Sequence, residues 1–281
     1  YPPHGLDRNG VSGGHSEFGS HILSGDMGAA TKVIDRYLSE AKRSNSLLLI
    51  SAESLFNHPE RIRNISNKYR VKILSYYRDP IASIASLYHQ SVKRHMYGSR
   101  VDQFIQYILK QDNDSVSGKI FDRWAAEFPL SDLRVEYYSK DYYETNSLAS
   151  DFLNVLGLYD YSAVQFIKNE TVRVNGSYTS GAVELKRLIN RVLNRECTSL
   201  DGNVDRLLQS YSDHESCDEG LLTGIQYNKL TEEFRDIKDY VIDKYVSDSS
   251  LMRVGKLTES SVVIKGSRYS KSLEDGFYSA F

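Results

Sequence analysis

The sequence predicts an α/β protein with a central parallel sheet, flanking helices and a helical C-terminal extension. Two apolar runs, Leu47–Ile50 and Val71–Tyr77, have the composition of buried parallel strands. Apolar residues recur at helical spacing over Met27–Lys42 and again over Ile81–Val92. Strands that alternate with helices of this length are typical of a parallel sheet whose faces are covered by helices.

Composition excludes several classes of function. The chain has 281 residues, 40% of them hydrophobic, which is enough to bury a sizeable core. Its 35 Lys and Arg residues against 37 Asp and Glu residues give no basic field for nucleic acid. No apolar run approaches the ~20 residues of a membrane span, and no leader opens the chain, so we expect a cytoplasmic protein. Cys197 and Cys217 fit neither a disulfide framework nor a metal-ligand spacing, and we expect no metal site.

The elements follow one another along a single predicted domain, residues 1–246. Residues 1–21 are rich in Gly, Pro, His and Ser and predict a loop, while residues 201–220 are acidic and predict an exposed segment. The tail, 247–281, has no long apolar stripe and is interpreted as partly disordered or as an arm that binds a partner. Periodicity predicts the following further elements: a short helix from His58, helices over Val101–Leu109 and Val116–Phe128, a strand over Leu133–Tyr138, a helix ending near Leu158, and helices over Ser180–Asn194 and Leu221–Tyr245.

The stretch Val71–Arg94 reads as a strand, a tight turn and a helix. Asp79 stands at the N-cap and Pro80 at the first helical position. The unpartnered N–H groups of a helix start attract anions, and Arg78 adds a positive fork beside them. This stretch therefore predicts a phosphate-binding pocket. The alternative is an ordinary strand-turn-helix unit in which Arg78 makes a surface ion pair.

The spacing within this stretch carries a family resemblance. Arg78, followed eight residues later by Ser86 and then by Leu-Tyr-His, resembles the 3'-phosphate-binding segment of sulfotransferases that use 3'-phosphoadenosine 5'-phosphosulfate (PAPS). The resemblance extends more weakly from about Leu47 to Leu158. It implies a P-loop-like sulfotransferase fold in which Arg78 and Ser86 bind the 3'-phosphate of PAPS.

The family also closes a polar loop over the nucleotide. By this resemblance Arg173, Asn175 and Ser177 are candidates for nucleotide contacts, and ordinary loop capping is the alternative. One part of the family pattern is missing, because no N-terminal strand with a Lys-x-Gly-Thr-Thr loop for the 5'-phosphosulfate precedes these elements. Either the chain is a truncated copy of an active enzyme, which is our expectation, or the protein has lost this loop.

Two residues are candidates for the chemistry. Glu53 follows the predicted strand Leu47–Ile50 at the edge of the sheet where ligands bind in α/β proteins. A carboxylate in a partly dry cleft can accept the proton of an attacking alcohol, although Glu53 could equally cap a helix or pair with an arginine. His15 is, by resemblance to bacterial polysaccharide sulfotransferases, a candidate acceptor contact or auxiliary base.

The sequence thus predicts an enzyme that moves a sulfuryl group from PAPS to a hydroxyl or amine of an acceptor, for which a carbohydrate is our expectation. Two alternatives stay open. One is a non-catalytic nucleotide- or polysaccharide-binding protein on the same scaffold. The other is a glycosyltransferase, for which the run Asp112-Asn113-Asp114 matches the metal-binding Asp-x-Asp pattern.

Overall fold

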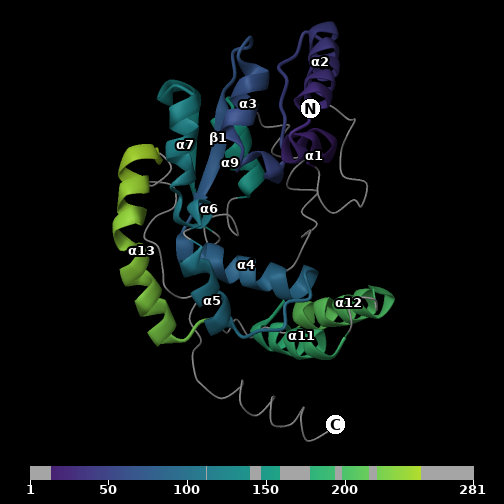
Figure 1. Ribbon diagram of the computed structural model, residues 1–281, viewed down its shortest axis with the longest axis vertical. Helices are drawn as coiled ribbons and strands as arrows, with labels where there is room; N and C mark the ends of the chain where they lie inside the picture. Colours follow the sequence, from purple (N-terminus) through teal and green to yellow (C-terminus); the bar gives the residue numbers. More distant parts are fainter. Residues whose placement is uncertain are drawn as a thin grey trace, which may run out of the picture.

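The computed structural model describes residues 14–111, 113–139, 147–158, 178–193, 198–214 and 220–247 (Figure 1). It is a mixed α/β protein, mostly helical, with a small parallel sheet of two strands in the described part of the chain. In chain order the elements are α1 (Ser16–Ser24), α2 (Met27–Arg43), the short 3-10 helix η1 (Glu53–Leu55), α3 (Pro59–Ser66), β1 (Ile73–Arg78), α4 (Pro80–Arg94), α5 (Val101–Lys110), α6 (Asp114–Ser117), α7 (Ile120–Glu127), the 3-10 helix η2 (Leu130–Asp132), β2 (Leu133–Tyr138), α9 (Leu148–Val155), α11 (Ser180–Val192), α12 (Thr198–His214) and α13 (Gly224–Tyr245).

The two strands pair in parallel over their whole length, from Ile73 opposite Leu133 to Arg78 opposite Tyr138. On its other side β2 makes one parallel bridge, between Val135 and Val246. Both strands were predicted from the sequence, and β2 has the predicted bounds. The sheet is smaller than predicted, however, and its two strands do not establish a sulfotransferase fold.

The strand predicted at Leu47–Ile50 is absent from the described sheet. Residues 46–52 are extended but pair with no strand in the described part of the chain, and the side chain of Leu47 is 91% exposed. Leu48 and Ile50 nevertheless pack against the core. An apolar composition allows a strand, but a strand also needs a neighbouring backbone that takes up its hydrogen bonds.

Two separate hydrophobic clusters make up the core. The sheet cluster lies between β1, β2 and the helices α1, α2, α3 and α7, and contains Trp124 as predicted. The helical cluster lies between α4, α5, α11, α12 and α13, with Ile84, Tyr88 and Val92 of α4 fully buried. Helix α4 crosses the middle of the molecule, below the sheet in the view of Figure 1 and above α11 and α12. The chain passes from one cluster to the other at the turn between β1 and α4.

The prediction of a loop over the first 21 residues was wrong for residues 16–21. Residues 16–21, expected in a loop, begin helix α1, because Phe18 and Ile22 share a buried face and Gly25 closes the helix with a positive φ of 78°. The acidic segment at 201–214, predicted to be exposed, forms most of helix α12, which is largely exposed but buries Leu208 against the helical cluster. A single buried turn can hold a helix whose other faces are polar.

The side chains of the sheet divide into an apolar face and a polar face. Residues two apart share a face, so Ser75 and Tyr77 lie beside Val135 and Tyr137 in the sheet cluster. The opposite face carries the following residues: Leu74, Tyr76 and Arg78 from β1, with Arg134, Glu136 and Tyr138 from β2. Parallel strands normally have apolar residues on both faces, so a polar face indicates a role other than core packing.

Within the part of the chain that the structure describes, no helix combines the length and apolarity needed to cross a bilayer. The longest described helix, α13, has charged residues throughout. Residues 248–281, predicted as a tail, lie outside the described residues.

Candidate functional site

The turn between β1 and α4 has the local structure that the sequence predicts. The carboxylate of Asp79 caps α4 and accepts hydrogen bonds from the backbone N–H groups of Ile81 at 2.9 Å and Ala82 at 3.4 Å. Its backbone carbonyl accepts the N–H of Ser83 at 2.9 Å. Because Pro80 has no N–H, the donors at the start of α4 are all taken. The anion-binding amides predicted here are therefore not available to a ligand.

A second charge reinforces this arrangement. The ammonium of Lys238, 159 residues later in the chain, lies 2.5 Å from the other carboxylate oxygen of Asp79. Helix α13 thereby holds the start of α4 by an ion pair that sequence spacing could not have indicated. Binding of an anion near this turn would therefore require side-chain donors, because the backbone amides of the helix start are already hydrogen-bonded.

Arg78 is the side chain best suited to that role. It ends β1 on the polar face of the sheet, and its guanidinium carbon lies 5.3 Å from the ring centroid of Tyr138 on the neighbouring strand. The Nε atom is buried and has no hydrogen-bond partner among the described residues. Burial lowers the pKa of the Arg78 guanidinium, against the opposing effects of Tyr138 and Asp79.

No ion pair joins Arg78 to an acidic side chain in the described part of the chain. Desolvating a guanidinium without an anionic partner is costly. Such a side chain is retained where a ligand supplies the missing anion, and this makes Arg78 the centre of the candidate site.

Ser86 lies on the helix that follows this arginine. It is partly buried in the second turn of α4, as the sequence predicts, on a turn that also carries the buried Ile84 and Tyr88. Its hydroxyl has no hydrogen bond to another described residue. Arg78 and Ser86 therefore come from consecutive elements, and each has hydrogen-bonding capacity to spare.

Glu53 opens the short helix η1, directly after the extended segment 46–52. Its side chain is exposed rather than held in a partly dry cleft. An exposed carboxylate is an effective base only where a bound acceptor covers it. Glu53 thus stays a candidate whose environment depends on the ligand.

His15 differs from its prediction. Its ring is fully buried and packs edge-on against Tyr37, with 5.5 Å between ring centroids. The Nδ1 atom lies 3.1 Å from the backbone N–H of Ser51, and the N–H of His15 donates to the Ser51 carbonyl at 2.6 Å. A buried ring cannot contact an acceptor in this arrangement. His15 instead fixes the backbone two residues before Glu53, and this connection brings the two predicted catalytic residues into one neighbourhood.

The remaining predicted site residues cannot be placed. Arg173, Asn175 and Ser177 lie outside the described residues, as does Asp112 of the Asp-x-Asp run. In the described ranges, no group of three or more His, Cys, Asp or Glu side chains is arranged to hold a metal ion.

The polar face of the sheet contributes residues that the sequence analysis missed. The phenol of Tyr76 donates to the buried carboxylate of Asp151 on α9 at 3.1 Å, and this bond ties α9 to the face that carries Arg78. Glu136 is fully buried on the same face and accepts from Nε of Arg134 at 2.6 Å. The polar residues at 134, 136 and 138 alternate along β2, and this alternation was the only feature of the sequence that could have indicated the polar face.

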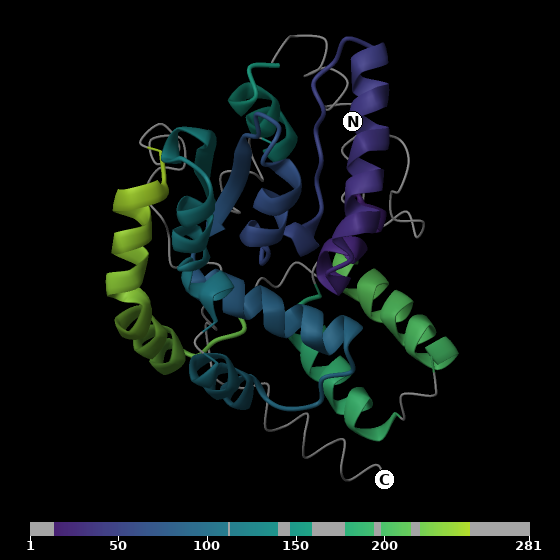
Figure 2. The ribbon, with the colours of Figure 1, turned by 45° about the horizontal axis from the view of Figure 1, so that its top comes forward.

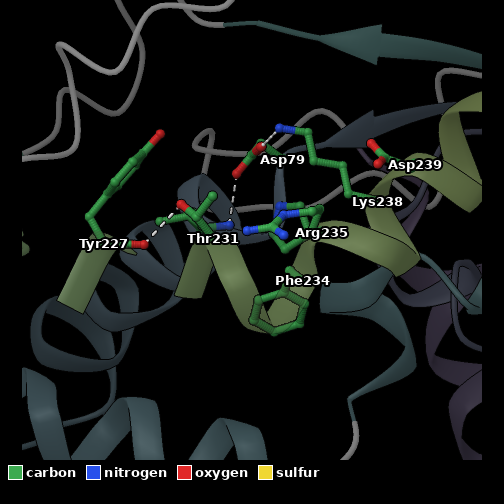
Figure 3. Close-up of a pocket in the computed structure, with 9 residues that line it drawn as sticks. Asp79, Tyr227, Thr231, Phe234, Arg235, Lys238 and Asp239 are labelled. Carbon is green, nitrogen blue, oxygen red and sulfur yellow. Dashed lines mark hydrogen bonds and ion pairs between the residues drawn. The ribbon is translucent and has the colours of Figure 1, made fainter. Parts of the chain in front are cut away.

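A pocket opens on the other side of the turn, between the start of α4 and α13 (Figure 3). Pro80 and Ile81 contribute from α4, and the remaining lining residues besides Asp79 come from α13: Tyr227, Thr231, Phe234, Arg235, Lys238 and Asp239. Figure 3 shows Lys238 reaching over to Asp79 while Arg235 lies between Phe234 and the ion pair. The pocket adjoins the candidate site through Asp79 but does not include Arg78.

Comparison with known proteins adds no assignment: no family model matches the sequence, and neither the curated proteins nor the solved structures contain a significant match. Function must therefore be argued from the residues themselves. Their geometry describes a partly buried arginine at the end of a parallel strand, a serine on the next helix, and a glutamate at the end of a neighbouring extended segment.

Proposed function

We propose that this protein binds a 3'-phosphorylated nucleotide at Arg78 and Ser86 and transfers the sulfuryl group of PAPS to a hydroxyl or amine acceptor, with a carbohydrate as the preferred acceptor class. The observation that carries the proposal is Arg78, a partly buried cation whose Nε atom has no partner in the described part of the chain. A phosphate dianion would restore both the charge and the hydrogen bonds that burial removes.

The ring of Tyr138 supports the same role for Arg78. Stacking of the guanidinium over this ring limits its motion and leaves its edge for a bidentate contact. The hydroxyl of Ser86 would donate a further hydrogen bond from α4. Asp79, directly after Arg78, is neutralised by Lys238, so its charge opposes an incoming phosphate less than an unpaired carboxylate would.

In the proposed reaction the acceptor oxygen attacks sulfur and the bond between sulfur and the bridging phosphate oxygen breaks. The electron pair of that bond leaves with adenosine 3',5'-bisphosphate. Glu53 accepts the proton that the acceptor hydroxyl loses. His15 is a positioning residue in this scheme, because it holds the backbone at Ser51 ahead of Glu53.

Isothermal titration calorimetry of the full chain with adenosine 3',5'-bisphosphate tests the binding step. We expect Arg78→Ala to weaken binding at least tenfold, because it removes a charge-assisted pair to phosphate. Arg43→Ala, an exposed arginine at the end of α2, is the matched control and should leave affinity unchanged. Ser86→Ala should weaken binding less, and Ser91→Ala on the same helix should not.

Turnover of PAPS with a sugar acceptor tests the chemistry separately. Removal of a general base typically lowers kcat by a factor of about 10² to 10⁴, so Glu53→Gln should lose turnover while it retains bisphosphate binding. Glu233→Gln, an exposed glutamate on α13, is the control. Binding without turnover in the unmodified chain would favour the non-catalytic nucleotide-binding alternative. Sugar-nucleotide binding that requires Mn²⁺, with no bisphosphate binding, would favour a glycosyltransferase.

A further inference from the structure

The pocket between the start of α4 and α13 takes no part in the proposed nucleotide site. Both ribbon views show α13 running past the start of α4 (Figures 1 and 2), and the pocket lies where the two helices meet. Its volume is about 140 Å³. A cavity of about 150 Å³ accommodates a benzene ring. The pocket therefore has room for one six-membered ring.

The walls of this pocket offer apolar and aromatic surface to such a ring. Pro80 and Ile81 are buried on the α4 side, and Phe234 and Tyr227 are half-buried on the α13 side. Ile81, Phe234 and Tyr227 also pack in the helical cluster, so neighbouring side chains hold them in place. Aromatic side chains pack well against another ring in an offset or edge-to-face arrangement. The walls thus favour an aromatic ligand over an aliphatic one.

The charges of the pocket are unevenly paired. Lys238 lies 2.5 Å from Asp79, whereas no hydrogen bond or ion pair within the described residues engages Arg235. Figure 3 shows Arg235 between Phe234 and the ion pair. An exposed arginine is ordinarily solvated, but this one borders a hollow of the size of a ring. A guanidinium is a planar fork of donors that matches a carboxylate in a bidentate contact.

The acidic side chains of the pocket limit the charge that a ligand can carry. The charge of Asp79 is balanced by Lys238, but Asp239 has no ion pair in the described part of the chain. Asp239 follows Arg235 by one helical turn, so it repels an anion bound there. This repulsion is about twice as large for a dianion as for a monoanion. The pocket therefore favours a ligand with a single negative charge.

We propose that this pocket binds a small aromatic monocarboxylate, with its ring between Ile81 and Phe234 and its carboxylate on the guanidinium of Arg235. The ring supplies the apolar contact that the walls offer, and the carboxylate supplies the partner that Arg235 lacks among the described residues. The site goes beyond the proposed nucleotide-binding function and does not depend on it, because neither Arg78 nor Ser86 lines the pocket.

Nuclear magnetic resonance titration of the full chain with sodium benzoate tests the proposal. We expect saturable shifts of the backbone amides of Asp79 and Ile81 and of residues 227–239. Benzamide has the same ring without the charge, so it should bind at least tenfold more weakly. Phthalate, which adds a second carboxylate, should also bind more weakly than benzoate because it meets the repulsion of Asp239 twice.

Two substitutions separate the contribution of the charge from that of the space. Arg235→Gln should lower the affinity for benzoate at least tenfold and leave that for benzamide unchanged. Arg70→Gln, an exposed arginine outside the pocket, is the matched control and should change neither affinity. Thr231→Phe fills the pocket and should abolish binding of both compounds. Thr231 is exposed, and its hydroxyl donates to the Tyr227 carbonyl of its own helix at 2.9 Å, so this variant should fold.

Three results would overturn the proposal. An absence of saturable shifts in the unmodified chain would show that the pocket takes no such ligand. Equal affinities for benzoate and benzamide would show that Arg235 does not recognise the carboxylate. Shifts centred on residues 134–138 would assign benzoate to the site of Arg78 instead. Adenosine 3',5'-bisphosphate is titrated in parallel, and Arg235→Gln should bind it as the unmodified chain does, so failure of this proposal is distinguishable from failure of the proposed function.

Discussion

Buried polar groups are paired more fully beside the helical cluster than in the sheet cluster, where Trp124 is hydrogen-bonded to the Phe56 carbonyl but Tyr77 is not bonded to a described residue. In the helical cluster, the fully buried Lys186 pairs with Asp201, and Asn190 donates to the backbone carbonyls of Val92 and Tyr97 at 2.7 and 3.2 Å. Beside them, Arg187 pairs with Glu184 at 2.8 Å. In the sheet cluster, Tyr77 ends in a buried hydroxyl with no partner among the described residues.

The paired groups lie in a structural region of the protein, whereas the end of the sheet carries the residues of the candidate site. The polar bonds of the helical cluster tie α11 and α12 to the end of α4, so its buried charges hold helices together. At the end of the sheet, by contrast, the buried Nε atom of Arg78 has no hydrogen-bond partner among the described residues. An unsatisfied buried group costs stability, and that of Arg78 is the reason why the candidate site is centred on this residue.

Substitution of the buried Arg187 and of the partly buried Arg78 should give the largest contrast. Arg187→Met leaves Glu184 without its cation, and we expect a loss of about 3 kcal/mol in the free energy of unfolding. Arg78→Met removes a guanidinium that has no ionic partner among the described residues, so we expect no loss and up to about 1 kcal/mol of gain. Urea denaturation of both variants measures these values. A similar loss in both would show that Arg78 is paired after all.

The two buried tyrosines provide a smaller and cleaner comparison. The hydroxyl of Tyr88, in the helical cluster, donates to the carbonyl of Ser99 at 3.1 Å, whereas the buried hydroxyl of Tyr77 has no partner among the described residues. We therefore expect Tyr88→Phe to cost about 1 kcal/mol of stability and Tyr77→Phe to be neutral or slightly stabilising. Thermal and urea unfolding would both report the difference. If Tyr77→Phe is the more costly change, the hydroxyl of Tyr77 has a hydrogen-bond partner outside the described residues.

The smallest expected effect lies where α13 contacts α7. Partial burial acts to raise the pKa of Asp122, but hydrogen bonds from Tyr240, Tyr245 and Lys244 outweigh it, so the pKa is lowered. A lowered folded-state pKa contributes stability above the unfolded-state pKa, and this contribution is lost as the pH falls through the folded-state value.

Unfolding midpoints measured from pH 6 down to about pH 3 should therefore fall less steeply for Asp122→Asn than for the unmodified chain. The difference should be modest, because the carboxylate is 42% exposed and salt screens its interactions. Identical slopes for the two proteins would show that acid sensitivity arises elsewhere.

Much of the local structure was predictable because its causes are local. The Asp79 cap, the Pro80 helix start and the alternation in β2 follow from neighbouring residues, and all three were confirmed. The predicted pairing of strand Leu47–Ile50 was wrong because pairing depends on a second backbone. The roles predicted for Arg78, Ser86, Glu53 and His15 stay predictions, and no sequence pattern indicated that the fully buried ring of His15 accepts the backbone N–H of Ser51.

The sequence by itself determined where α4 begins and where β2 begins and ends, because capping, proline and alternation act over a few residues. It also placed an arginine at the end of a strand and a serine two turns into the following helix. Only the tertiary structure decided that Lys238 and Asp79 neutralise each other, that Asp151 reaches Tyr76, and that β1 pairs with β2. These features depend on which distant segments come together, and free energy of packing over the whole chain, rather than any local preference, selects those contacts.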